Sequence, residues 1–277
     1  MLTELLIDKP PIDQLQPTAL GVDTAITDAD AEVARGYYRE RIPRMLGLRR
    51  RTAASARAKY DRIAGQYQAA EARLSPSSKM LAFVGDEVRF VSEMAYLDYY
   101  RRVLANTIAR LGARSVLEVG AGELNTLLPV VQLLVGRLDK AAALDISEKR
   151  LAVGRAHDTA GLISSFITAS ADRIPLPDGS YDVIFTTHCL EQSPEILESA
   201  LREFVRVASR YILLAEPAYE LAHSVQRRRI RKMGYVRGIP HTAKRLGLNV
   251  VSHQLMPVRE YLNGTAITLI ELAREGS

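Results

Sequence analysis

Residues 115–124, Ser-Val-Leu-Glu-Val-Gly-Ala-Gly-Glu-Leu, constrain the fold more than any other segment of this chain. An apolar run ends at Val119 and is followed by Gly120 and Gly122. Such a run is typical of a buried strand in a parallel sheet, and the glycines after it predict a tight turn. Because glycine carries no side chain, the backbone of this turn can approach a ligand closely.

One acid, Glu118, interrupts the apolar run two residues before Gly120. A dinucleotide-binding turn at this position would hold a pyrophosphate, which the carboxylate would repel. The same carboxylate can face a cationic ligand, such as the amino and sulfonium groups of S-adenosylmethionine (SAM). The alternative is a turn whose glycines only permit close packing, since glycine motifs are loose signals when taken alone.

A second acid follows at a distance that suits a nucleotide ribose. We expect a helix over residues 124–137 and then a short strand over 141–144, with Asp145 at its carboxyl end, 25 positions after Gly120. One helix and one strand return the chain to the same edge of a parallel sheet, where a carboxylate can accept both ribose hydroxyls. Alternatively, the segment 145–147 only begins a helix, with Asp or Ser as its cap.

These segments resemble the successive motifs of the class I SAM-dependent methyltransferases. Glu118, Gly120 and Gly122 match the family pattern acid-x-Gly-x-Gly-x-Gly, in which Leu124 replaces the third glycine. Residues 169–185 are similar to the family segment that binds adenine and leads into the fourth strand.

Two further stretches continue this resemblance. His188-Cys-Leu-Glu-Gln stands where many relatives have His-x-Leu-Glu-His, and Glu216-Pro217 follows the apolar strand expected over 211–215. The resemblance extends over about residues 93–271 and is nearest to the branch of quinone-biosynthesis C-methyltransferases and small-molecule tailoring enzymes.

The resemblance implies SAM as the cofactor and an α/β fold with a doubly wound, mostly parallel seven-stranded sheet of the Rossmann-like methyltransferase type. Its closing strands would be 250–255 and 266–271, the last one antiparallel. Asp145 would bind the ribose, Asp172 the adenine amino group, and Ala171 would leave room for the ring. The implied cofactor-binding residues are Glu118, Gly120, Ala121, Gly122, Asp145, Ile146, Ala171, Asp172 and His188.

The chain is expected to divide into three parts. Residues 1–30 contain prolines and scattered acids without a sustained period, which predicts an extended or poorly ordered arm. Residues 31–78 have helical patterning and contain a Tyr-Asp-x-Ile-Ala-x-x-Tyr stretch at 60–67; in relatives, helices of this kind fold over the cofactor as a cap. Residues 79–277 form the SAM-binding domain, beginning with a helix over 93–111 that Ser92 caps and Gly112 ends.

Basic residues gather in two segments. Residues 35–62 hold ten Lys or Arg against two acids, and residues 227–245 hold eight against none. Such segments are often solvated helix faces. Alternatively, they attract an anion, which can be a phosphorylated or carboxylated substrate, an anionic membrane surface or RNA.

Several classes of protein are excluded or disfavoured. Cys189 is the only cysteine, so neither an intrachain disulfide nor a cysteine-rich metal site can form, and no metal is expected. The sequence has no apolar run of 18 residues, so we expect no transmembrane helix. The amino terminus lacks a secretory signal pattern, which predicts a cytoplasmic protein.

Three functions are consistent with the sequence. We favour methyl transfer to a small-molecule acceptor, with an anionic acceptor expected from the basic segments. His188 is the first candidate for a general base and Glu191 the second, since both follow the fourth strand at the ligand-binding edge. The alternatives for His188 are shaping the cofactor pocket or a hydrogen bond within a loop. The other two functions are RNA methylation, which the basic segments alone support, and a non-catalytic scaffold, against which the three acids Glu118, Asp145 and Asp172 argue.

Overall fold

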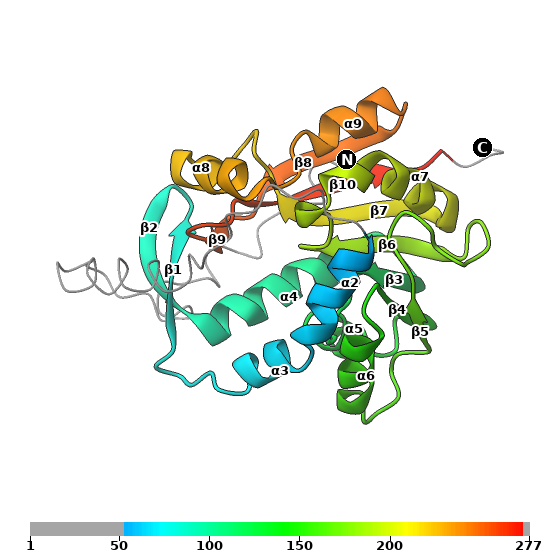
Figure 1. The fold of residues 1–277 in the computed structure, drawn as a ribbon, viewed down its shortest axis with the longest axis horizontal. Helices are drawn as coiled ribbons and strands as arrows, with labels where there is room; N and C mark the ends of the chain where they lie inside the picture. The colour runs from blue at the N-terminus through cyan, green and yellow to red at the C-terminus, as the bar shows by residue number, and fades with distance from the viewer. Residues whose placement is uncertain (1–52, 274–277) are drawn as a thin grey trace.

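The computed structural model describes residues 53–273 (Figure 1). Its main sheet has seven strands in the order β5-β4-β3-β6-β7-β10-β8. The strands are β3 (Ser115–Val119), β4 (Lys140–Asp145), β5 (Ser165–Thr168), β6 (Tyr181–Thr187), β7 (Ala208–Pro217), β8 (Asn249–Leu255) and β10 (Thr265–Glu271). Strands β3 to β7 are parallel, whereas β10 pairs antiparallel with both β7 and β8. The predicted doubly wound, mostly parallel sheet with an antiparallel last strand is confirmed.

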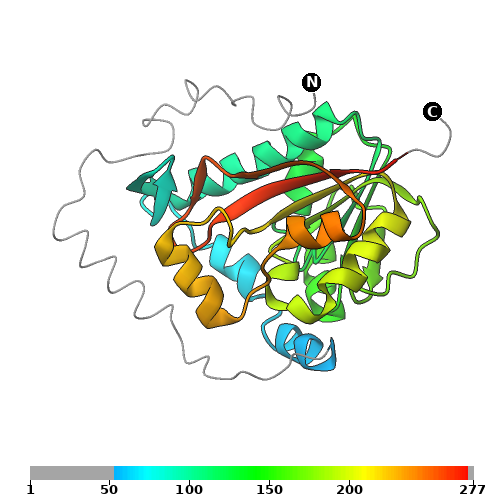
Figure 2. The same ribbon diagram turned by 90° about the horizontal axis from the view of Figure 1, so that it is seen from above.

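Helices cover both faces of this sheet. The helices of the parallel crossovers are α5 (Leu127–Leu133), α6 (Glu148–His157) and α7 (Leu197–Val207). Figure 2 shows α4 (Glu93–Arg110) and α9 (Ile239–Arg245) on opposite sides of β10. Alternate residues of β3 enter the two cores, Val116 the core beneath α4 and α5, and Leu117 the core beneath α7 and α9. A strand buried on both faces therefore reads as an apolar run.

Local sequence signals predict both ends of α4 correctly but not the start of α5. Helix α4 begins after Ser92, whose Oγ accepts a hydrogen bond from the Ala95 amide, and ends before Gly112 at φ +61°, as predicted. The helix predicted over 124–137 is shorter than expected. Leu124 adopts a left-handed conformation (φ +64°), which an α-helix cannot continue, so α5 begins at Leu127.

A second, three-stranded sheet was not predicted. Strands β1 (Lys79–Val84) and β2 (Glu87–Ser92) form a hairpin, and β9 (Val258–Glu260) pairs with β1 on its other side. This sheet brings a segment near the carboxyl end of the chain beside the residues that precede α4. Helix α8 (Ser224–Met233) lies between β7 and α9 in the chain.

Two short helices, α2 (Ala53–Arg62) and α3 (Gln66–Glu71), precede the small sheet. They are the described part of the helical segment predicted over 31–78; the arm predicted over 1–30 lies outside the described residues. None of the helices within residues 53–273 has the length and apolar character needed to cross a bilayer.

Candidate active site

The turn after β3 brings the backbone against neighbouring segments. Gly120 has a φ of +82°, its amide donates to the Leu144 carbonyl at 2.7 Å, and a Cβ on it would collide with the Cys189 side chain. Gly122 also has a positive φ, of +54°. Both positions therefore require glycine. Leu124 shares the left-handed conformation of this turn, but its side chain is fully buried, so packing offsets the conformational cost.

Glu118 presents a buried carboxyl oxygen without a partner. Its side chain is 1 % exposed, and one oxygen accepts a hydrogen bond from the Thr187 hydroxyl at 2.5 Å. The other oxygen, Oε2, has no hydrogen-bond partner by distance and angle within residues 53–273, although the Leu127 amide acts to lower the pKa of the carboxyl. Burial raises the pKa of Glu118 to about 7. An orphaned carboxyl oxygen of this kind is suited to a cationic ligand group.

Asp145 lies at the carboxyl end of β4, as predicted. One of its oxygens accepts from the Gly122 amide at 2.9 Å and the other from the Ser147 amide at 2.8 Å. Burial raises the pKa of Asp145, against the opposing effect of Arg150. Ser147 caps α6 by accepting from the Arg150 amide, so this segment starts a helix and also carries the acid.

Two cavities meet at the glycine turn and share Gly120, Arg150 and His188. The smaller has a volume of about 90 Å³ and the larger about 490 Å³. Asp145, Ile146, Ala171 and His188 line the smaller cavity, and Glu118, Gly120, Ala121, His188 and Glu191 line the larger one. Most of the predicted site residues are thus brought together around these cavities.

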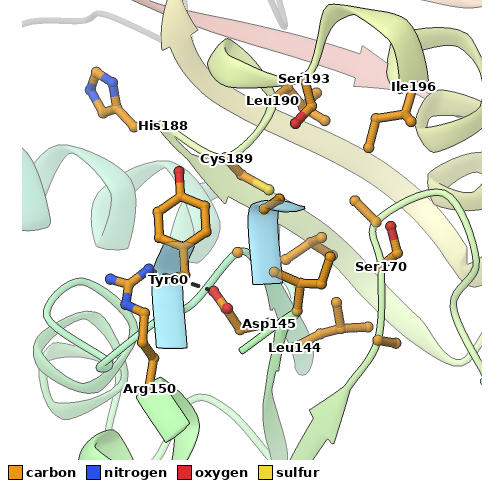
Figure 3. Close-up of a pocket in the computed structure, with 16 residues that line it drawn as sticks. Tyr60, Leu144, Asp145, Arg150, Ser170, His188, Cys189, Leu190, Ser193 and Ile196 are labelled. Carbon is orange, nitrogen blue, oxygen red and sulfur yellow. Dashed lines mark ion pairs between the residues drawn. The ribbon is translucent and has the colours of Figure 1, made fainter. Parts of the chain in front are cut away.

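Asp172 is placed differently from Ala171. Its carboxylate accepts a hydrogen bond from the Ser170 hydroxyl, and Ser170 rather than Asp172 is among the residues that line the smaller cavity. Figure 3 shows the Tyr60 ring in this cavity, between Cys189 and the Asp145–Arg150 pair. Tyr60, on α2, thus occupies space next to Asp145 at the carboxyl end of β4.

His188 and Glu191 form a hydrogen-bonded pair. The His188 Nδ1 lies 2.8 Å from Glu191 Oε2, and Nε2 lies 3.1 Å from the Thr265 hydroxyl. Burial disfavours the charged ring, but Glu191 outweighs it and the pKa of His188 lies above its usual value. Burial likewise opposes the charge of Glu191, yet His188 keeps the pKa of that carboxyl below its usual value. Both ring nitrogens therefore have partners, and a role as base requires Nε2 to leave Thr265.

The turn that carries His188 depends on a residue that was not predicted as part of the site. Glu216, at the end of β7, is 2 % exposed and accepts hydrogen bonds from the Thr186 hydroxyl and from the amides of Cys189, Leu190 and Glu191. His188 itself has a φ of +52°, which is uncommon for a residue with a side chain. The only sequence feature that pointed to Glu216 was its position at a strand end next to Pro217.

Glu123 fastens α3 to the glycine turn. Its carboxylate accepts from the amides of Gly65 and Gln68 at 3.0 and 2.8 Å, and the Gln68 side chain donates to the Glu123 carbonyl at 2.8 Å. The Arg150 guanidinium lies over the rings of both Tyr60 and Tyr67. The contacts of α2 and α3 therefore converge on the residues around the cavities.

We expect Glu123→Ala to loosen α3 because two half-buried amides lose their acceptor, at roughly 0.5–1.5 kcal/mol for each hydrogen bond. Limited proteolysis should then cut within residues 62–72 faster than in the parent, and Glu148→Ala, an exposed acid on α6, serves as the control. Equal cleavage rates in the two variants would show that Glu123 does not hold this helix.

The comparisons with known proteins point to one family. Residues 117–211 match the family model of a methyltransferase domain. No curated protein matches the chain. Among solved structures, magnesium protoporphyrin IX methyltransferase from Synechocystis PCC 6803, with bound S-adenosylhomocysteine (SAH), is 14% identical with a TM-score of 0.51, over 65% of this chain and 88% of that one.

Two other structures have the same fold. The [4+2]-cyclase SpnF is 12% identical with a TM-score of 0.60, over 81% of this chain and 97% of that one. The trans-methyltransferase CalH, in complex with SAH, is 17% identical with a TM-score of 0.50, over 65% and 58%. At these identities the likeness shows the fold alone.

The residues around the cavities fit the cofactor of this family. The orphaned oxygen of Glu118 suits an ammonium group, and the carboxylate of Asp145 lies at the sheet edge where the fold binds a ribose. Residues 117–211 thus belong to a methyltransferase domain, and this match, the fold and the strand-end acids together support a class I SAM-dependent methyltransferase, an enzyme whose cofactor is S-adenosylmethionine.

Proposed function

We propose that this enzyme transfers the methyl group of SAM to a small-molecule acceptor bound in the larger cavity. The supporting observation is the unpartnered oxygen of Glu118, because it belongs to the wall of a cavity of about 490 Å³. Small-molecule sites typically measure about 300–1,000 Å³. This cavity can therefore hold the methionine part of the cofactor together with an acceptor of modest size.

In this proposal, residues at the ends of different strands bind different parts of the cofactor. Glu118 binds the amino group, the turn from Gly120 through Ala121 to Gly122 supplies the backbone against the methionine part, and Asp145 accepts the ribose hydroxyls. Ile146 and Ala171 contact the adenine ring, while Asp172 acts on it through Ser170, to whose hydroxyl it is bonded. His188 lies at the junction of the two cavities.

The chemistry requires alignment more than acid or base groups. SAM supplies an electrophilic methyl group, and the chain holds the acceptor in line with it; alignment of this kind can contribute about 7–11 kcal/mol. The His188–Glu191 pair can then take up a proton from a hydroxyl acceptor only after Nε2 is released from Thr265. We therefore propose first a positioning role for His188 and Glu191, and a base role second.

Helices α2 and α3 serve, in this proposal, as the cap expected over residues 31–78. The smaller cavity, at about 90 Å³, is too small for an adenosyl group while Tyr60 occupies it. Entry of the cofactor thus requires movement of α2, whose contacts include Asp61 with Ser147 at 2.6 Å and the Arg57 side chain with the Ile146 carbonyl at 3.1 Å.

Calorimetry with SAH tests the cofactor assignment. We expect the parent protein to bind SAH, and Asp145→Ala to weaken the affinity by roughly 1.5–3 kcal/mol, the range for a lost charged hydrogen bond. Asp98→Ala, an exposed acid on α4, is the matched control and should leave the affinity unchanged. Absence of binding to the parent protein would reject the proposed function.

An anionic acceptor, expected from the basic segments, is the second candidate. Arg229 on α8 donates to Asn263 at 2.6 Å, and Asn263 lines the larger cavity. The neighbouring Arg227, Arg228 and Arg231 are exposed. Most of the basic segment 35–62 precedes residue 53 and lies outside the described residues. If the acceptor were instead an RNA, the protein would bind RNA, and its affinity would fall steeply as the salt concentration rises.

A further inference from the structure

The larger cavity has a wall remote in sequence from the glycine turn, which we call the acceptor wall. It consists of Glu93, Tyr96 and Tyr100 on α4 together with Glu260 on β9. The small sheet places Glu260 there, because β9 pairs with β1, and the hairpin partner of β1, β2, continues directly into α4. The acceptor wall therefore combines two elements that lie far apart in the sequence.

Carboxylates dominate the charged side chains that line this cavity. The acids are Glu71, Glu93, Glu118, Glu191 and Glu260, and the basic residues are Arg101, Arg150 and His188. The bases are already committed to partners. Arg101 donates to Glu71 at 2.6 Å and to the Asn125 carbonyl, Arg150 lies 3.5 Å from Glu123, and His188 pairs with Glu191.

The two acids of the acceptor wall have no cationic partner within residues 53–273. No side-chain hydrogen bond or ion pair of Glu93 is found there. Glu260 accepts from the neutral Asn263 amide at 2.8 Å and forms no ion pair, although its charge contributes to the raised pKa of His188. Because Arg101 and Arg150 are paired elsewhere and Arg229 contacts Asn263 rather than either acid, this end of the cavity keeps an excess of negative charge. A cationic ligand group would compensate it.

The tyrosines supply an independent indication of a ligand. Tyr100 is 7 % exposed, and its hydroxyl has no hydrogen-bond partner in the described part of the chain, although the residue lines the cavity. Burial raises the pKa of Tyr100 well above its usual value, so the hydroxyl stays a neutral donor and acceptor. The ring centroids of Tyr96 and Tyr100 lie 6.3 Å apart. The face of a tyrosine ring attracts a cation that lies within about 6 Å of the ring centroid.

We propose that the methyl acceptor carries a basic nitrogen that binds as an ammonium group at the acceptor wall, between the carboxylates of Glu93 and Glu260 and against the rings of Tyr96 and Tyr100. This inference rests on the proposed function, because it names the substrate class of that site. It concerns binding and leaves the atom that receives the methyl group unassigned. It also reverses the charge that the basic segments predict for the acceptor.

A pair of probes with opposite charge tests this proposal on the SAH-loaded protein. Phenethylamine and 3-phenylpropionate have the same ring and similar length, and their binding can be compared by calorimetry or ligand-observed NMR near pH 7.5. We expect phenethylamine to bind at least about tenfold more tightly than 3-phenylpropionate, and this preference to weaken as salt is added.

The double variant Glu93→Gln/Glu260→Gln should lower the affinity for phenethylamine about tenfold or more while leaving the affinity for SAH unchanged. Glu87→Gln on β2 removes the same charge from an exposed position and should change neither affinity. Absent or equal binding of phenethylamine, tighter binding of 3-phenylpropionate, or an amine affinity that survives the double variant would each overturn the proposal. Failure of SAH itself to bind would instead reject the proposed function.

Discussion

Glu118→Gln should make the unliganded protein more stable at pH 8 and, at the same time, weaken its binding of SAH. In the parent protein, burial raises the pKa of Glu118 from its ordinary 4.5 to about 7. The folded state therefore holds this proton more tightly than the unfolded state, and the stability of the parent falls as the pH rises from about 4.5 to about 7. Above pH 7 the folded protein carries a buried, desolvated charge that glutamine would not have.

The expected gain follows from this shift. Each pKa unit corresponds to about 1.4 kcal/mol, so the variant should gain up to about 3 kcal/mol over the parent between pH 5 and pH 8. A glutamine oxygen can still accept from Thr187, so this hydrogen bond is retained. The affinity for SAH should fall by roughly 1.5–3 kcal/mol at pH 8, because the ammonium group loses its charged partner. The affinity of the parent, but not that of the variant, should fall as the pH drops below 7.

Urea unfolding at pH 5 and pH 8, combined with calorimetry, measures both effects. Glu148→Gln, an exposed acid at the start of α6, is the control for a general change in net charge. A variant that is less stable than the parent at pH 8 and binds SAH equally well would contradict the assignment of Glu118. The opposite signs of the two effects would show that this carboxylate is retained for binding at the expense of stability.

The parts of the fold that could be predicted depend on local signals. Ser92 and Gly112 fix the ends of α4 through a side-chain cap and a left-handed glycine, both visible in the sequence. The apolar run of β3 likewise indicates a strand buried on both faces. The start predicted for α5 was wrong. The left-handed conformation of Leu124 depends on the packing of its side chain, and the sequence near it does not reveal that packing.

Contacts between distant segments account for what was missed. The small sheet pairs Ala82 with Glu260, and no short-range pattern connects them. The acids at the ends of β3 and β4 could be placed because parallel strands end at one sheet edge. The hydrogen bonds of Glu123 and Glu216 could not be predicted, since each acid accepts from amides of another segment. The charge of the acceptor wall likewise depends on which arginines already have partners.

Glu216→Gln should destabilise the protein strongly and reduce methyl transfer further than the loss of stability explains. The carboxylate accepts from three amides of the turn after β6, of which Glu191 bonds to Oε2 and Cys189 and Leu190 to Oε1. An amide group cannot reproduce this pattern, because its nitrogen is a donor and would face the backbone N–H of one or more of these residues. Each buried donor left without an acceptor costs about 1–3 kcal/mol.

The same turn sets the position of His188, whose φ of +52° persists only while the surrounding structure holds it. Loss of the Glu216 contacts should therefore let His188 relax and leave Glu191, which would shift the pKa of His188 back toward its usual value. Histidine ¹H NMR titration measures that shift, and urea unfolding measures the stability.

Thr186→Val is the matched control for Glu216→Gln, because it removes only the hydroxyl donor to the same carboxylate and should cost about 1 kcal/mol. If the two variants lose the same stability and leave the titration of His188 unchanged, the amides of the turn do not depend on Glu216. The charge of Glu216 itself also raises the pKa of His188, so a shift of the titration counts for the turn only together with a greater loss of stability than in Thr186→Val. With both results, the buried acid at the end of β7 organises the junction of the two cavities, and it does so without lining either of them.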